Sequence, residues 1–128
     1  MGRLGQFVSA PPGMIFVDRG DPAGSDWTQA GLTMDNAWHD LDMSGVVPAG
    51  TKAVLVRICT KSAGAGDYLQ IRKKGNANAL NVITCKTIVA AVQQWVDGTV
   101  FCNGDRKVQY LASVAFTNIL ITIGGWWI

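Results

Sequence analysis

The chain has 128 residues, of which 48% are hydrophobic and 16% are charged, and its formal net charge is +2. This composition is too apolar for a disordered chain. The basic residues are scattered, which excludes the broad basic face that direct nucleic-acid binding needs. Their densest cluster, at residues 72–74, is typical of a solvated turn at the end of a strand.

The low charge has a second implication, because an average globular domain is about 25% charged. Together with a mean hydropathy of +0.19, it favours a homo-oligomer that hides some apolar surface between its subunits. A monomer with a well-filled core is the alternative.

Residues 1–13 hold three glycines and two prolines, which predicts an extended N-terminal arm ahead of one folded domain over residues 14–128. Fully extended, the arm would reach about 45 Å. The arm lacks the apolar core of a secretory signal, and no apolar run approaches the roughly 20 residues of a membrane span. We therefore expect synthesis in a cytoplasm and no membrane span.

After the arm, short β-prone segments alternate with turn residues. Turn signals that recur every 8–12 residues are typical of a β-sandwich or jelly roll. The sequence therefore predicts an all-β fold, a jelly-roll-like β-sandwich of about eight strands. The β-prone segments are residues 14–18, 37–43, 51–61, 67–74, 79–87, 88–96, 99–102, 106–112 and 118–127.

Three local expectations are specific. In residues 51–61, the alternate face made by Val54, Val56, Ile58 and Thr60 is expected to lie in the core. Residues 88–96 read as a strand, although a 3.6-residue period also allows a helix. The dipeptide Asp97-Gly98 predicts a tight hairpin.

No catalytic or metal site is recognisable. The single histidine, His39, is expected on the strand face opposite Asp40 and Asp42, so these three side chains do not converge. All nine acidic residues are aspartates, which argues against a glycosidase-type carboxylate pair. Cys59, Cys85 and Cys102 match no zinc spacing and are expected to be reduced. We expect neither enzymatic activity nor a cofactor.

The five tryptophans are the more informative residues. We expect Trp38 and Trp95 to serve mainly as core. Trp126 and Trp127 are neighbours in a strand, so one should face the core and the other the surface. An apolar C-terminal residue strengthens the case for a covered surface. The candidate interface or ligand residues are Trp27, Tyr68, Trp126, Trp127 and Ile128.

Residues 38–42 (WHDLD), residues 47–57 (VPAGTKAVLVR) and the closing residues 119–127 (ILITIGGWW) resemble short β-sandwich modules of tailed phages. Such modules serve as capsid decoration (cement) proteins or as tail-fibre and receptor-binding heads. The resemblance implies a virion location, assembly into a homo-oligomer such as a trimer, and contact with a major capsid protein or another virion protein.

Two functions follow from these observations. One is a capsid-decorating protein that self-associates. The other is a carbohydrate-binding or receptor-binding head that binds a host-surface glycan through exposed aromatics and polar loops. A flat aromatic patch with aliphatic neighbours would favour assembly, whereas aromatics lining a groove beside Asp and Asn would favour a glycan.

Overall fold

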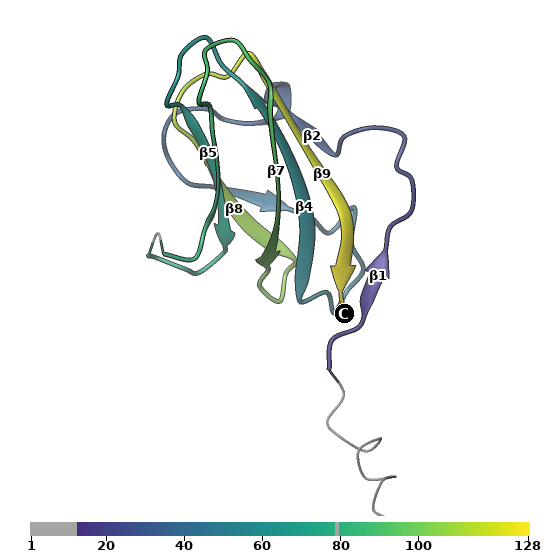
Figure 1. Ribbon diagram of the computed structural model, residues 1–128. Coiled ribbons are helices and arrows are strands. Elements are labelled where there is room, and N and C mark those ends of the chain that lie inside the picture. Colours follow the sequence, from purple (N-terminus) through teal and green to yellow (C-terminus); the bar gives the residue numbers. More distant parts are fainter. Residues whose placement is uncertain (1–12, 79) are drawn as a thin grey trace, which may run out of the picture.

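The computed structural model describes residues 13–78 and 80–128, which form two packed antiparallel sheets (Figure 1). The predicted arm, residues 1–13, lies outside the described residues except for Gly13. The five-stranded sheet contains β1 (Phe16–Asp18), β2 (Trp27–Thr28), β4 (Ala53–Lys61), β7 (Gln94–Phe101) and β9 (Asn118–Trp127). The four-stranded sheet contains β3 (His39–Asp42), β5 (Tyr68–Lys73), β6 (Ile83–Lys86) and β8 (Lys107–Ala112).

The strand order identifies the fold. In the first sheet the order is β1-β9-β4-β7, with β2 beside β1 on the same edge of β9, and in the second it is β3-β8-β5-β6. If β1 and β2 are the halves of one interrupted first strand, the first strand pairs with the last, the second with the second last, and so on inward. This rolled-up hairpin is a jelly roll, so the predicted fold class is confirmed.

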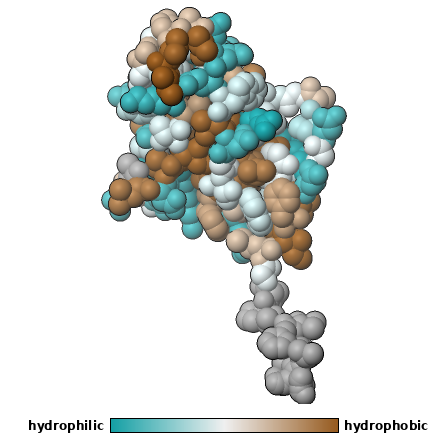
Figure 2. All heavy atoms as spheres, viewed as in Figure 1, coloured by the Kyte–Doolittle hydropathy of each residue, from teal (hydrophilic) through white to brown (hydrophobic). Residues whose placement is uncertain are grey.

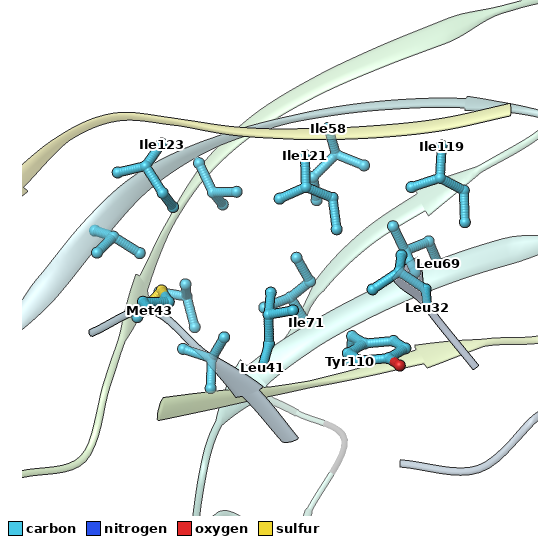
Figure 3. Packing of buried hydrophobic residues seen from close by; sticks show 14 of the residues in the cluster. Leu32, Leu41, Met43, Ile58, Leu69, Ile71, Tyr110, Ile119, Ile121 and Ile123 are labelled. Carbon is cyan, nitrogen blue, oxygen red and sulfur yellow. The ribbon is translucent and has the colours of Figure 1, made fainter. Parts of the chain in front are cut away.

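The core lies between the sheets and is almost wholly aliphatic. Figure 3 shows Ile119, Ile121 and Ile123 of β9 on one side, facing Leu41, Ile71 and Tyr110 from the second sheet. In β4 the inward residues are Val54, Val56, Ile58 and Thr60, all buried, as the alternation predicts. Burying each large aliphatic side chain contributes about 1.5–3 kcal/mol.

The register of β9 contains an irregularity beside two glycines. Val56 of β4 pairs with Ile123, but the next residue, Leu55, pairs with Gly125, so Gly124 is an extra residue in a β-bulge. A Cβ on Gly125 would lie 2.3 Å from Cζ of Phe16 and 2.7 Å from the carbonyl oxygen of Val17. The strand therefore needs glycine at this position for the close approach of β1.

The predicted hairpin at Asp97-Gly98 is wrong, because β7 runs straight through both residues. Asp97 pairs with Arg57 of β4, and Gly98 pairs with Val56. A Cβ on Gly98 would lie only 2.8 Å from Cδ1 of Ile83, a residue of the facing sheet. The glycine serves the close approach of β6, which is its other common role in strands.

The segment before β7 also differs from expectation. Residues 88–93 form neither a strand nor a helix but a loop, in which Ala91 has a positive φ of 60°. Its backbone N–H donates to the carbonyl oxygen of Ser62, and the Ile88 N–H donates to the side chain of Gln94. These contacts fix the loop, and β6 is correspondingly short.

Candidate interaction surface

The outer face of the five-stranded sheet is the least polar surface of this sandwich. Strand alternation turns one residue of each pair toward the core and the other outward. The outward residues of β7 are Trp95, Asp97, Thr99 and Phe101, and all four are exposed. In β4 the outward series includes Leu55 and Arg57, and in β9 it includes Leu120 and Thr122.

One register row of this face carries three aromatic side chains. Phe16 pairs with Trp127, Trp127 with Ala53, and Ala53 with Phe101. The rings of Phe16 and Trp127 lie 4.9 Å apart at an interplanar angle of 59°, a geometry that aromatic pairs favour. We call these four residues the aromatic row. Phe16 and Phe101 at its ends are 43% and 45% exposed.

The tryptophan pair at the end of β9 divides as predicted. Trp126 packs against the core, whereas Trp127 stands in the aromatic row on the outer face. Ile128 is 39% exposed and exchanges backbone hydrogen bonds with Ile15, which extends the pairing of β1 and β9 by one residue on each side. The C-terminus is thus a paired strand end with an apolar surface.

The other two candidate residues lie elsewhere. Trp27 in β2 is half-buried and packs against the core. Tyr68 begins β5 in the four-stranded sheet, also half-buried. Of the five candidates, only Trp127 is placed in the aromatic row, with Ile128 next to it in the chain, while Trp126 packs against the core. Trp27 and Tyr68 lie apart from them.

The structure corrects one expectation about the tryptophans and adds residues that the sequence did not single out. Trp95 is 56% exposed and is not a core residue, since Val96 and Val100 take the inward positions of β7. Trp38 is not part of the core cluster either: it is half-buried, and the guanidinium carbon of Arg72 lies 3.9 Å from the centre of its ring. Phe16 and Phe101 in the aromatic row were missed, and their alternation with inward residues is the signal that could have found them.

An Arg–Asp pair lies in the middle of the outer face. Arg57 donates from Nε and Nη2 to the two carboxylate oxygens of Asp97, at 2.8 and 3.1 Å. These hydrogen bonds lower the pKa of Asp97 and raise that of Arg57. A shallow hollow beside this pair is lined by Gly20, Pro22, Leu55 and Thr122 among others.

A second apolar patch lies on the loop at residues 88–93. Ile88, Val89 and Val92 are 74%, 56% and 49% exposed, and Trp95 follows directly. Figure 2 shows apolar side chains gathered at the upper end of the molecule, where Figure 1 places the loops between strands. Four large apolar side chains in eight residues are more than the isolated surface hydrophobics that need no explanation.

The outer face of the four-stranded sheet is polar by comparison. Asp40 accepts hydrogen bonds from Lys74 and Gln109, which lower the pKa of its carboxyl group. Gln109 in turn accepts from Nε of Arg72 at 3.0 Å. These cross-strand contacts satisfy one another, so this face needs no partner to cover it.

His39 lies on the opposite face of β3 from Asp40 and Asp42, as the alternation predicts. Its backbone pairs with that of buried Tyr110, while Asp40 and Asp42 face outward. The Nε2 atom of His39 instead lies 2.7 Å from Oδ1 of Asp35, an exposed residue of the preceding loop. Across residues 13–78 and 80–128, no three His, Cys or acidic side chains gather as metal ligands.

All three cysteines are buried and free. Thr60 Oγ1 lies 3.2 Å from Cys85 Sγ, and Cys102 Sγ donates to the carbonyl oxygen of Thr51. Cys85 and Cys102 therefore act as small core side chains, whereas Cys59 is buried in the outward row of β4 beside Trp95 and Leu120. In the described part of the chain, none of the helical structure is long and apolar enough to cross a membrane.

No protein-family model matches the chain, and no curated protein sequence matches it. Among solved structures, the coat protein of Tobacco streak virus, in its C2 crystal form, is similar with a TM-score of 0.33 and 12% sequence identity. The match covers 91% of this chain and 85% of that one. A score this low supports no functional conclusion, so the function must be argued from the fold and the surface.

Proposed function

We propose that this protein is a structural component of a virus particle, a capsid-decorating (cement) protein that self-associates and stabilises the shell. The strand order carries the proposal, because viral capsid domains are among the main users of the jelly roll. Lectins and cupins use it as well, so the fold alone does not decide the function. The surface supplies the second argument.

That surface suits protein–protein assembly. The aromatic row lies on the outer face of the five-stranded sheet, and the next outward row holds Leu55, Gly125 and Thr99. The Arg57–Asp97 ion pair on this face is neutral overall. A flat, largely uncharged patch with aromatic residues is typical of the centre of a protein interface.

Binding to virus particles tests this function. Virus particles would be purified on a density gradient from two sources. One is cells that carry the native gene, and the other is the same cells with that gene deleted. We expect the protein to co-purify with wild-type particles, and particles from the deletion to lose their shell integrity at a lower temperature. Adding back purified protein should restore the higher temperature. Absence of the protein from purified particles would refute the proposal.

A receptor-binding head is the second candidate, and exposed Trp95 is the observation that favours it. A tryptophan that is 56% exposed offers a flat apolar ring on which a sugar could stack. Adsorption of particles to host cells and binding to a glycan array would be compared for the wild type and Trp95→Ala. The Trp127→Ala variant tests the aromatic row in the same assays. Loss of glycan binding in either variant would favour the second candidate over the first.

A further inference from the structure

Among the described residues, strand β7 forms one edge of the five-stranded sheet, with β4 on one side and no strand on the other. It is also one of the longer strands, at eight residues. Its inward residues Val96 and Gly98 are only half-buried, whereas the inward residues of β4 are fully buried. The sandwich is therefore open along this edge.

The backbone groups that face this open edge can be identified from the ladder. The N–H of Cys102 donates to the carbonyl oxygen of Lys52 of the chain before β4. Because residues of an antiparallel pair alternate between bonding to one neighbour and to the other, the even-numbered residues of β7 bond to β4. The N–H and C=O groups of Trp95, Thr99 and the other odd-numbered residues point to the edge.

This edge lacks the protection that exposed strands normally carry. Natural edge strands are shielded by lysine, proline, bulges or short length. Residues 94–101 (QWVDGTVF) contain no proline and no lysine, and the pairing with β4 is regular over eight residue pairs. The single charge, Asp97, is already paired with Arg57 of the same sheet. An unprotected edge of this kind is a template for another strand.

The sequence of β7 is complementary to itself when it is reversed about Gly98. In that antiparallel register Trp95 lies opposite Phe101 of the second copy, Asp97 opposite Thr99, and Val96 opposite Val100. Glycine, with no side chain, stands on the two-fold axis. The backbone N–H and C=O groups of the odd-numbered residues face the edge. Each of the pairs Trp95–Phe101 and Asp97–Thr99 can therefore exchange two backbone hydrogen bonds with the second copy. Aromatic pairs across strands contribute about 0.2–1 kcal/mol each.

The neighbouring register centred on Asp97 is less favourable. Centring the pairing on Asp97 would place two aspartates directly opposite each other, and like charges in that position are destabilising. It would also leave Phe101 beyond the end of the paired segment. A register midway between these two would place a residue whose backbone faces the edge opposite a residue whose backbone is already bonded to β4. This mismatch would break the ladder of hydrogen bonds between the two copies.

We propose that two copies of this chain pair antiparallel through β7 about a two-fold axis at Gly98. This inference rests on the self-association in the proposed function and specifies its geometry. The two five-stranded sheets become one continuous sheet. The aromatic row is then extended at Phe101 by Trp95 of the second copy, and after it by Cys59 and Leu120 of that copy, which share one register row with Trp95.

Disulfide trapping tests the register. Directly opposed hydrogen-bonded residues have Cα atoms about 5.5 Å apart, within the range that a disulfide spans. Within one copy, positions 95 and 101 are separated by about 20 Å of strand. We expect the double variant Trp95→Cys/Phe101→Cys to give a covalent dimer under mild oxidation, and each single variant to stay uncrosslinked. The three native cysteines are buried, so they should not form crosslinks of their own.

The Asp97→Cys variant distinguishes the registers. Efficient crosslinking of this variant, with none in the double variant, would overturn the axis at Gly98. An absence of crosslinks in both would overturn pairing through β7 in either of these two registers.

A second measurement does not depend on new cysteines. Thr99→Pro removes an N–H that faces the open edge while leaving the bonds to β4 in place. Sedimentation should show a wild-type dimer, a dimer for the control Thr99→Val, and a monomer for Thr99→Pro with an unchanged circular dichroism spectrum. A wild type that is monomeric at every concentration, or a dimeric Thr99→Pro, would overturn the proposal.

The same variants separate this inference from the proposed function. A monomeric wild type that still co-purifies with particles would refute pairing through β7 alone. A wild type that dimerises through β7 but is absent from particles would refute the virion role alone.

Discussion

Arg19 and Asp26 close the loop between β1 and β2 and fasten it to β9. Arg19 donates to both carboxylate oxygens of Asp26, at 2.5 and 2.7 Å, and to the carbonyl oxygen of Ile123 at 2.9 Å. Asp26 accepts from the N–H of Ile123 at 2.8 Å. Ile123 lies where β1 has ended and β2 has not begun, so these two side chains satisfy the backbone that neither strand reaches.

We expect the Asp26→Asn variant to be markedly less stable. The Asp26 side chain is 8% exposed and that of Arg19 is 22% exposed, so the substitution leaves a poorly solvated guanidinium without its counter-charge. The free energy of unfolding should fall by about 2–3 kcal/mol, measured by urea denaturation. The matched control is Asp97→Asn, which breaks an Arg–Asp pair that is more than half exposed and should change stability far less. Equal losses in the two variants would contradict this role for Asp26.

The two adjacent glycines of β9 should respond differently to alanine. A Cβ on Gly125 would overlap the ring of Phe16 and the carbonyl oxygen of Val17, whereas the nearest atom to a Cβ on Gly124 is 3.8 Å away. We expect Gly125→Ala to lower the free energy of unfolding by about 1–3 kcal/mol and Gly124→Ala to be nearly neutral. Thermal denaturation of the pair measures this, and a neutral Gly125→Ala would mean that β1 does not hold Phe16 over this glycine.

The stability of the protein should decrease in acid because of its surface aspartates. Hydrogen bonds from Arg57 lower the pKa of Asp97, and those from Lys74 lower the pKa of Asp40. A pKa that is lower in the folded state contributes stability above the unfolded value of about 3.9, and this contribution is lost as the pH falls. The free energy of unfolding should therefore decline below about pH 4. The Asp97→Asn variant should show a shallower decline.

The cysteine thiols should be unreactive in the native state. Burial raises the pKa of Cys59, Cys85 and Cys102, so little thiolate exists at pH 8 and reagents cannot reach it. A colorimetric disulfide reagent should label no cysteine in the folded protein and all three in guanidinium chloride. Asp97→Cys supplies an exposed thiol as a positive control, and rapid labelling of the native wild type would contradict the buried placement.

The strands with regular alternation were predictable from the sequence because their pattern is local. Val54, Val56 and Ile58 face the core of β4 as expected, and the split of Trp126 from Trp127 follows from neighbouring positions in one strand. The number of strands and the spacing of turns sufficed for the fold class. None of these inferences needed to know which strands are neighbours.

The errors arose where a distant contact decides between two local readings. Asp-Gly favours a hairpin, but Gly98 is needed because Ile83 approaches from the other sheet. Reading a turn there split β7 in two and hid the alternation that turns Trp95 and Phe101 outward. The sequence marks Tyr68 and Trp27 as candidates because they are aromatic, yet only the topology determines which sheet and face each occupies.

Because of the bulge at Gly124 and Gly125, the faces that Trp126 and Trp127 take depend on how many residues separate them from Ile123. Ile123 faces inward and so does Trp126, although they are three positions apart. Without the bulge, a β9 of the same length would alternate strictly from Ile123 and would expose Trp126 and bury Trp127. Deleting one glycine as well would return both tryptophans to the faces that they occupy now. The bulge thus absorbs one residue of length, so an in-frame deletion of either glycine would leave the C-terminal end of this sheet with the same inner and outer faces.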